Sequence, residues 1–264
     1  VFGGGLLFKS NNMYLNNYGT IVVTNEAVRF ETGSSYFVDT YLGKVYLHAP
    51  GNCFGDSMVF KSRNDALYIR TDNAIESTTL NRFGRNNTDA NTEILDLGGH
   101  DVEFIGCKTS YSSASVTSDA PAKLVFAGDI GCINKFVCRG YAGFEQAGSG
   151  TSTVAVVNAS LGTLGASGSA LVKFDANGRW AGDLALSESG KMDITSAAQI
   201  SKKASVFLSG DDCRLNLTGT VRVRFLYKNG VSLPPGKYTS SELVNIGSGT
   251  LEVTGIPGVL IIVR

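Results

Sequence analysis

The chain has 264 residues, of which 23 are Lys or Arg and 23 are Asp or Glu, so its formal net charge is zero. Charged residues make up 17% of the chain, glycines number 32 and hydrophobic residues reach 43%, which describes a globular chain poor in charge and rich in glycine. A neutral chain lacks the Lys and Arg excess that captures nucleic acid or an anionic membrane, and no apolar run is long enough for a membrane-spanning helix.

The chain starts at Val1 without an initiator Met and without the basic and apolar regions of a signal peptide. Such a start is expected of a secreted protein whose signal has been removed, or of an excised fragment. The composition favours the first interpretation. We therefore expect a secreted protein that acts outside the cell or at the cell surface.

Short apolar runs bounded by Gly, Asn, Asp and Ser then follow one another, with the alternation and the β-branched and aromatic content of strands. No window carries the i, i+3, i+4, i+7 stripe of a helix, and residues 195–201 and 240–246 are expected to form a helical turn at most. The chain is therefore predicted to be all-β. The predicted strands are residues 19–24, 27–30, 44–47, 57–61, 66–70, 93–97, 101–105, 122–126, 153–157, 170–174, 183–186, 191–194, 204–208, 214–217, 220–225 and 250–253.

These strands are too short and too many for a single immunoglobulin-like sandwich. Hairpin signals are scarce: Asn-Gly occurs at Asn177-Gly178 and Asn229-Gly230, and only the second lies between convincing strands. Short strands joined by bends rather than reversals favour a parallel β-solenoid, in which each coil stacks on the previous one. A jelly roll or two tandem β-sandwiches is the alternative.

The five cysteines are Cys53, Cys107, Cys132, Cys138 and Cys213, and no C-x-x-C pair occurs among them. With only His48 and His100 available, a zinc ribbon or finger is excluded. Buried free thiols and one or two disulfides both remain open, and Cys132–Cys138 is the nearest pair in sequence. No metal or cofactor site is predicted.

Several segments resemble the coils of known β-helices. The stretch Ile94-Leu-Asp-Leu-Gly-Gly-His-Asp-Val-Glu-Phe104 resembles a coil of right-handed β-helices, and Leu124–Ile130 and Asn158–Leu171 are similar to repeats of the bacterial autotransporter-associated β-strand repeat proteins. The clearest similarity to that family lies in residues 210–253, which resemble its closing module: Gly210-Asp-Asp-Cys-Arg-Leu-Asn-Leu217, Phe225-Leu-Tyr-Lys-Asn-Gly-Val231, Leu233-Pro-Pro-Gly-Lys-Tyr-Thr239 and Gly247-Ser-Gly-Thr-Leu-Glu-Val253.

The resemblance implies an extracellular, right-handed β-helical passenger with a structural or adhesive role and with no catalytic residues to transfer. It also implies two parts, a solenoid body over residues 1–209 and a C-terminal closing module over residues 210–264. Relatives of this kind are often far longer than this chain.

Some β-helices cleave pectin, and three segments echo their motifs: Asn87-Thr88-Asp89, Gly98-Gly99-His100 and Asp211-Asp212. Their order along the chain is wrong for a polygalacturonase. Inverting hydrolysis needs two facing carboxylates, whereas neighbouring residues of a strand point to opposite faces. The Asp pair is better interpreted as a turn and His100 as a corner residue. We therefore expect no catalytic residues, although a polysaccharide-active enzyme stays open as the alternative.

Tyr and Phe together number 24 against a single Trp, and exposed rings can bind sugars. More often such rings stack inside the coils as core, and the sequence leaves both interpretations open. The candidates for a sugar platform are Tyr36, Tyr41, Tyr46, Tyr111, Tyr141 and Phe144. A surface polysaccharide is accordingly one predicted partner.

The chain closes with an apolar run, Val259, Leu260, Ile261, Ile262 and Val263, and it opens with the apolar Val1 and Phe2. The run is expected either to fold back as a core strand or to complete a neighbouring copy by strand addition. Contacts of the second kind that do not close on themselves build a filament. The sequence therefore predicts a secreted structural or adhesive protein that self-associates into an extracellular fibre or sheath, or alternatively a carbohydrate-binding or carbohydrate-cleaving β-helix.

Overall fold

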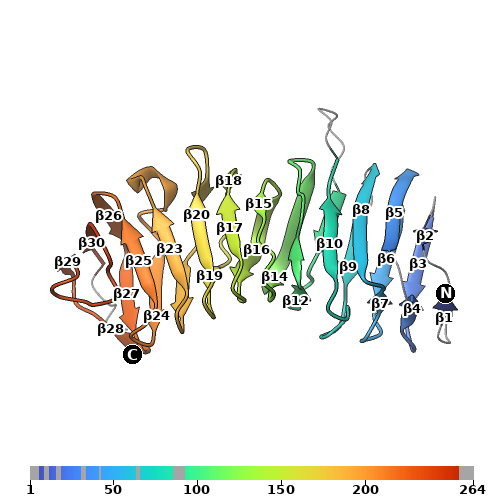
Figure 1. Cartoon of the computed structure of the whole chain (residues 1–264), viewed down its shortest axis with the longest axis horizontal. Helices are drawn as coiled ribbons and strands as arrows, with labels where there is room; N and C mark the ends of the chain where they lie inside the picture. Colours follow the sequence, from blue (N-terminus) through green and yellow to red (C-terminus); the bar gives the residue numbers. More distant parts are fainter. Residues whose placement is uncertain are drawn as a thin grey trace, which may run out of the picture.

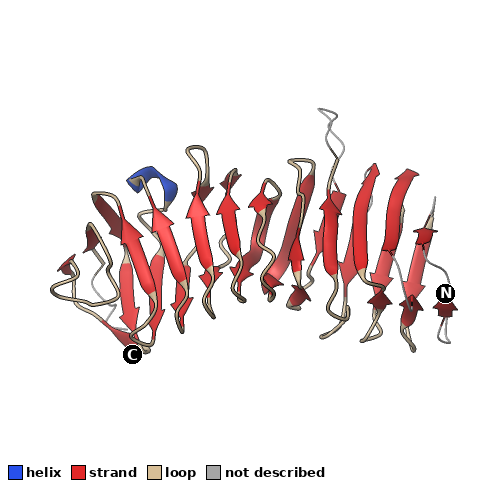
Figure 2. Ribbon diagram, in the orientation of Figure 1, coloured by secondary structure: helices blue, strands red, loops and turns tan. Residues whose placement is uncertain are grey.

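A computed structural model describes residues 6–8, 12–15, 19–30, 34–41, 43–63, 66–85 and 93–255, and the side chains of 19–30, 43–60, 66–85 and 93–255. The described chain winds as an elongated stack of short strands, with β1 at one end and β29 at the other (Figure 1). Nearly every strand pair is parallel, and strands dominate the ribbon from end to end (Figure 2). The predicted parallel β-solenoid is confirmed, and the alternative of a jelly roll or tandem sandwiches is not observed.

One long sheet runs through the stack and is built from strands of successive coils. From the N-terminal end its order is β3 (Thr20–Val23), β6 (Lys44–Leu47), β9 (Ala66–Ile69), β11 (Glu93–Asp96), β14 (Ala114–Phe126), β16 (Val137–Gln146), β19 (Leu164–Ala166), β22 (Leu184–Ser187), β24 (Ser205–Ser209), β27 (Phe225–Lys228) and β28 (Val231–Ser232), with β12 (Val102–Phe104) also beside β14.

The remaining strands form the other sides of the solenoid. Two five-stranded sheets contain β2 (Asn12–Leu15), β5 (Ser34–Tyr41), β8 (Ser57–Arg63), β10 (Thr79–Phe83) and β13 (Gly106–Cys107), and then β15 (Ile133–Asn134), β17 (Thr151–Val154), β20 (Leu171–Phe174), β23 (Lys191–Ile194) and β25 (Arg214–Leu217). Smaller sheets hold β1 (Leu6–Phe8), β4 (Val28–Phe30) and β7 (Cys53–Phe54), then β18 (Val157–Asn158) and β21 (Arg179–Trp180), and finally β26 (Thr220–Val223), β29 (Gly236–Tyr238) and β30 (Thr250–Val253).

The core is a set of columns in which one inward side chain per coil lies directly above its counterpart. Phe144, Leu164 and Leu184 are successive register partners 20 residues apart, and each is at most 1% exposed. Phe126 and Phe136 pack beside Phe144, with ring centroids 5.1–6.5 Å apart across the three pairs. Stacking of apolar side chains along the axis is therefore the main stabilising interaction of the solenoid.

Buried asparagine side chains at the corners bind neighbouring coils to one another. Asn52 is fully buried; its Oδ1 accepts the amide of Val28 at 2.9 Å and its Nδ2 donates to the carbonyls of Ala49 and Ala74, both at 2.7 Å. Because Val28 and Ala74 belong to the coils on either side, one amide group connects three coils. Asn158 repeats the arrangement by accepting the amide of Cys138 at 2.8 Å.

The strands β14 and β16 differ from the sequence prediction, which places a strand at 122–126 only, and each passes from one side of the solenoid to the next. Their pairing shifts register between Ser118 and Ala122. Residues 114–117 of β14 pair with β11, whereas 124–126 pair with β12. A β-bulge at the corner thus lets one continuous strand serve two sides.

The C-terminal region ends the regular winding with antiparallel strands. β28 pairs with β27 through the Asn229-Gly230 turn, where both residues have positive φ (51° and 79°), so the predicted hairpin is confirmed. β29 lies antiparallel to β30. The expected helical turn in 195–201 is also present, as a 3₁₀ turn over Ala197–Gln199 capped by Ser196. The predicted strand 220–225 is interrupted at Arg224, where the chain turns a corner between β26 and β27.

Candidate functional site

The apolar residues predicted to contact another subunit, namely Val1, Phe2, Val259, Leu260, Ile261, Ile262 and Val263, lie outside the described residues. The predicted boundary at residue 209 falls between β24 and β25. β25 continues the sheet of β23, and β27 continues the sheet of β24, so the core passes without interruption into the C-terminal region.

All five cysteines lie in the described part of the chain and are free thiols. Cys132 and Cys138 are not bonded to each other, and Cys132 instead lies beside Cys107 of the preceding coil. The hydrogen bond with Cys132, together with burial, raises the pKa of the Cys107 thiol, and burial raises the pKa of Cys138 well above its ordinary value. Both shifts favour the protonated thiol, as expected of thiols that fill a core.

His100 is a corner residue, as the sequence predicts. It follows Gly98 and Gly99, which both have positive φ, and its amide donates to the carbonyl of Leu97 at 2.9 Å. Its Nδ1 lies 2.7 Å from Oδ1 of Asp72, on the outside of the neighbouring coil. This contact joins two turns at the surface and does not include the Asp211-Asp212 pair.

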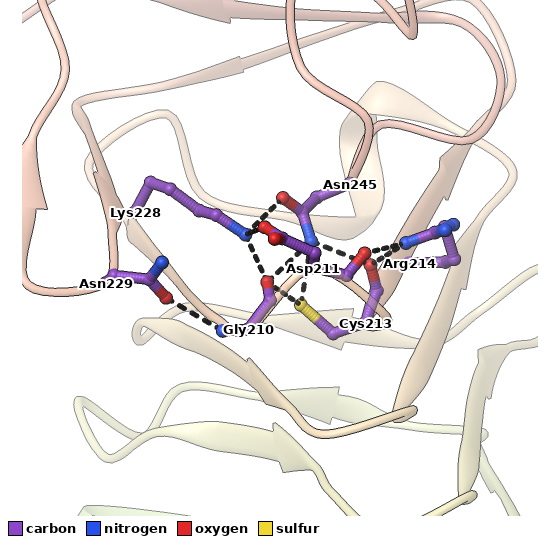
Figure 3. Close-up of polar contacts among 7 residues, drawn as sticks. All are labelled: Gly210, Asp211, Cys213, Arg214, Lys228, Asn229 and Asn245. Carbon is purple, nitrogen blue, oxygen red and sulfur yellow. Dashed lines mark hydrogen bonds and ion pairs between the residues drawn. The ribbon is translucent and has the colours of Figure 1, made fainter.

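Asp211 belongs to a polar network in the C-terminal region (Figure 3). The Lys228 ammonium lies 2.7 Å from the Asp211 carboxylate and 2.8 Å from Oδ1 of Asn245, and it also donates to the carbonyl of Gly210. The hydrogen bond from Lys228 and its positive charge lower the pKa of Asp211. Asn245 is fully buried and donates to the carbonyls of Gly210 and Cys213, at 3.1 and 2.9 Å.

This network holds the segment before β30 onto the last coils. The Asn245 side-chain amide donates to two backbone carbonyls, and the Lys228 ammonium donates to the Asn245 side chain (Figure 3). The arrangement is that of a structural clasp, and we assign it no ligand.

The predicted aromatic platform residues have different surroundings. Phe144 is 1% exposed and belongs to the core, and the guanidinium of Arg82 lies 4.7 Å from the ring centroid of Tyr111. Tyr46 stacks on Tyr68 with ring centroids 4.4 Å apart. The side chains of Tyr36 and Tyr41 lie outside the described residues, whereas Tyr141 is 45% exposed.

Tyr141 forms part of a groove of about 450 Å³, whose lining residues lie in β14 and β16 and in the segments just before β12, β19 and β22. Its walls come from five successive coils, because positions close to 20 residues apart are stacked along the axis. The lining residues are Asp101, Pro121, Ala122, Lys123, Tyr141, Leu161, Gly162, Thr163 and Asp183.

One wall of the groove is apolar. Ala122 pairs with Ala142, and the amide of Leu161 donates to the carbonyl of Gly140, so Tyr141 and Leu161 are neighbours along the axis. Leu161 is 62% exposed, which is unusual for a large apolar side chain beside an exposed ring. The two side chains together form a raised apolar ridge at the corner of the solenoid.

The opposite wall is polar and belongs to a second column. By the register of its neighbours, this column runs through Asp101, Lys123, Gly143, Thr163 and Asp183. Gly143 has no side chain to fill the space between Lys123 and Thr163. A Cβ there would lie 2.5 Å from the carbonyl oxygen of Thr163, so the close stacking of the coils requires glycine at this position.

The two aspartates anchor the ends of the groove. Oδ1 of Asp101 accepts the amide of Lys123 at 2.7 Å, and Oδ1 of Asp183 accepts the amide of Ser205 at 2.6 Å. Each carboxylate is therefore fixed by the next coil. Within the part of the chain that the structure describes, Oδ2 of each makes no hydrogen bond.

The Lys123 charge is balanced within the same face. Its Nζ lies 2.5 Å from Oε2 of Glu145, whose Oε1 accepts the Ser167 hydroxyl at 2.7 Å. Burial alone would raise the pKa of Glu145, but the hydrogen bonds from Lys123 and Ser167 outweigh it and lower the pKa. With this pair neutral, Asp101 and Asp183 give the groove a net negative charge.

Binding is the chemistry that this arrangement supports. Asp101 and Asp183 are four coil steps apart, about 19 Å at the spacing of parallel strands. This is well beyond the roughly 5–9.5 Å between the two carboxylates of a glycosidase. The two carboxylates thus cannot act as an acid–base pair on one bond, but an exposed ring with carboxylate acceptors can hold a ligand.

Across the described ranges, no group of three His, Cys, Asp or Glu side chains converges as a metal site would require. The helical segments in those ranges include none long and apolar enough to cross a membrane. Comparison of the chain with protein-family models, with curated proteins and with solved structures finds no match.

Proposed function

We propose that this chain is a secreted, non-catalytic β-solenoid of an extracellular or cell-surface structure, with a structural or adhesive role, and that copies of it associate into a fibre or sheath. The observation that carries the proposal is the difference between the two ends of the stack. At the C-terminal end the antiparallel strands β28 and β29 flank the last coils. At the other end β1, β2 and β3 each have a partner on one side only among the described strands.

An unpaired strand edge offers a row of amides and carbonyls to another strand. The hydrogen bonds between β3 and β6 show which backbone groups of β3 face β6. The amides of Lys44 and His48 donate to the carbonyls of Gly19 and Val23, both at 2.9 Å. Because residues of a parallel strand alternate between its two sides, Val22 presents its amide to the open side. The apolar run Val259–Val263 of a second copy is our proposed partner for this edge.

The resemblance of residues 210–253 to the closing module of autotransporter-associated surface proteins gives the proposal its extracellular setting. The composition, neutral and rich in glycine, is consistent with that setting.

Sedimentation velocity over a concentration series, with negative-stain microscopy of the same samples, tests the proposal. Wild-type protein should form end-to-end assemblies as its concentration rises. Val22→Pro should weaken association at least about fivefold, because proline removes the edge amide without removing a β3–β6 hydrogen bond. Val22→Thr keeps the amide and serves as the matched control. Dispersed monomers of wild-type protein at every concentration, or unchanged assembly of Val22→Pro, would overturn the proposal.

A further inference from the structure

We infer that the groove between the Tyr141–Leu161 ridge and the Asp101–Asp183 column binds a chain of neutral sugars. The inference adds a ligand to the proposed adhesive role and does not require self-association. It rests on the shape of the groove, on the chemistry of its two walls and on its charge.

The shape suits an extended ligand rather than a compact one. The groove has a volume of about 450 Å³ and is lined by five successive coils, so it follows the axis of the solenoid. At about 4.8 Å per coil, the distance from Asp101 to Asp183 is about 19 Å, which accommodates several linked sugar rings. A polysaccharide lying along the axis would run from Asp101 to Asp183 and pass Tyr141 and Leu161 between them.

The walls match the two surfaces of a sugar. A pyranose ring has an apolar face of C–H groups and an edge of hydroxyls. Tyr141 and Leu161, 45% and 62% exposed, offer an apolar surface to the C–H face of the ring. Oδ2 of Asp101 and of Asp183 can accept hydrogen bonds from the sugar hydroxyls. Oδ1 of each carboxylate already accepts a backbone amide, at 2.7 and 2.6 Å.

The position of these groups is fixed before any ligand arrives. The backbone amides of Lys123 and Ser205 hold the two carboxylates, and the Glu145 carboxylate holds the Lys123 side chain at 2.5 Å. Tyr141 stands on β16 between Gly140, whose carbonyl accepts the Leu161 amide at 2.8 Å, and Ala142, which pairs with Ala122. A site built on rigid strands loses little conformational freedom on binding, which favours affinity for a weakly contacting ligand.

The charge of the groove selects among polysaccharides. Lys123 and Glu145 neutralise each other, which leaves the two aspartates as uncompensated charges in the lining. Anionic chains such as polygalacturonate would meet like charge at both ends of the groove. A neutral chain meets hydrogen-bond acceptors there, so the ligand class that fits is a neutral glycan.

The test is affinity electrophoresis and calorimetry of the full chain with hydroxyethylcellulose and galactomannan as neutral probes and polygalacturonate as the anionic probe. Wild-type protein should bind at least one neutral probe and should not bind polygalacturonate. Tyr141→Ala should weaken binding about tenfold or more, whereas Tyr141→Phe, which keeps the ring, should stay within about threefold of wild type.

Two further variants distinguish the groove from other exposed surfaces. Asp183→Asn keeps an oxygen for the Ser205 amide but loses its charge, and it should weaken binding to neutral probes several-fold while leaving the melting temperature unchanged. Ile133→Ala removes an apolar side chain on β15, outside the groove, whose exposure (59%) is close to that of Leu161 (62%). This variant should bind as wild type does.

Absence of binding to both neutral probes would overturn the inference, as would equal binding by Tyr141→Ala or a preference for polygalacturonate. Sedimentation of the same preparations reports self-association separately. Failure of glycan binding is therefore distinguishable from failure of the proposed assembly.

Discussion

At the scale of single residues, coil stacking leaves no room for a side chain at certain glycines. A Cβ on Gly131 would lie 1.6 Å from the carbonyl oxygen of Thr151 in the next coil. Gly236, near the C-terminal end, is a useful contrast, because a Cβ there would meet nothing closer than the Tyr238 ring at 4.0 Å. The requirement for glycine thus depends on the neighbouring coil and not on the local sequence.

We predict that Gly131→Ala lowers the free energy of unfolding by about 3 kcal/mol, because the backbones of two coils must separate to admit the methyl group. Gly236→Ala should change it by no more than about 0.5 kcal/mol. Chemical denaturation of both variants measures the difference. Equal stability of the two variants would contradict the described coil contact.

A second residue-scale prediction concerns Glu145, whose pKa is lowered in the folded protein by Lys123 and Ser167. A carboxyl group with a lower pKa when folded stabilises the protein above its unfolded pKa of about 4.3, and this contribution is lost as the pH falls through the folded pKa. Wild type should therefore exceed Glu145→Gln in stability by a constant amount above about pH 5. The advantage should shrink below that pH, as measured by urea denaturation between pH 3 and 7. A difference independent of pH would show that the pKa is not lowered.

At the scale of strands, alternation and turn residues are enough to predict most elements. Runs such as 44–47 and 191–194 coincide with β6 and β23, because one face of each strand packs in the core and the other meets solvent. In the corner strands β14 and β16 only residues 122–126 are predicted, because Pro121 and Gly140 interrupt the local pattern. Their pairing is imposed by the coils on either side.

The groove could be predicted only in part. Tyr141 is among the aromatic residues that the sequence singles out, but its exposure and its neighbours are not visible locally. Leu161, Asp101 and Asp183 line one groove because the coils near them repeat at about 20 residues. That period is weak in the sequence, since turns of different length separate the strands, and only the stacked register shows which positions share a column.

The buried corner asparagines give a prediction at the scale of connected strands. Asn52→Ala would leave the Val28 amide and the carbonyls of Ala49 and Ala74 buried without their partner. We expect a loss of about 2–4 kcal/mol in the free energy of unfolding. Asn177→Ala, at an exposed turn, is the matched control and should be nearly neutral. If both variants lose the same stability, Asn52 does not join the coils.

At the scale of the whole molecule, each coil contacts mainly the coils before and after it. Stability then accumulates along the axis, and outward residues repeat at intervals set by the coil length. The groove, the clasp around Asn245 and the edge of β3 that has no partner among the described strands all follow from this geometry. Shape and surface, rather than a convergent reactive centre, are the properties that we connect with function.

The stacked register is the premise of every proposal above, and a pair of engineered cysteines tests it most directly. Ser187 and Ser209 are register partners that both point outward from β22 and β24, at the one-coil spacing that a disulfide can bridge. Ser187→Cys with Ser209→Cys should oxidise rapidly to an intramolecular disulfide. Ser187→Cys with Ser205→Cys, about 13 Å farther along the strand, should remain reduced. Failure of the first pair to close, or equal closure of both pairs, would contradict the stacked register.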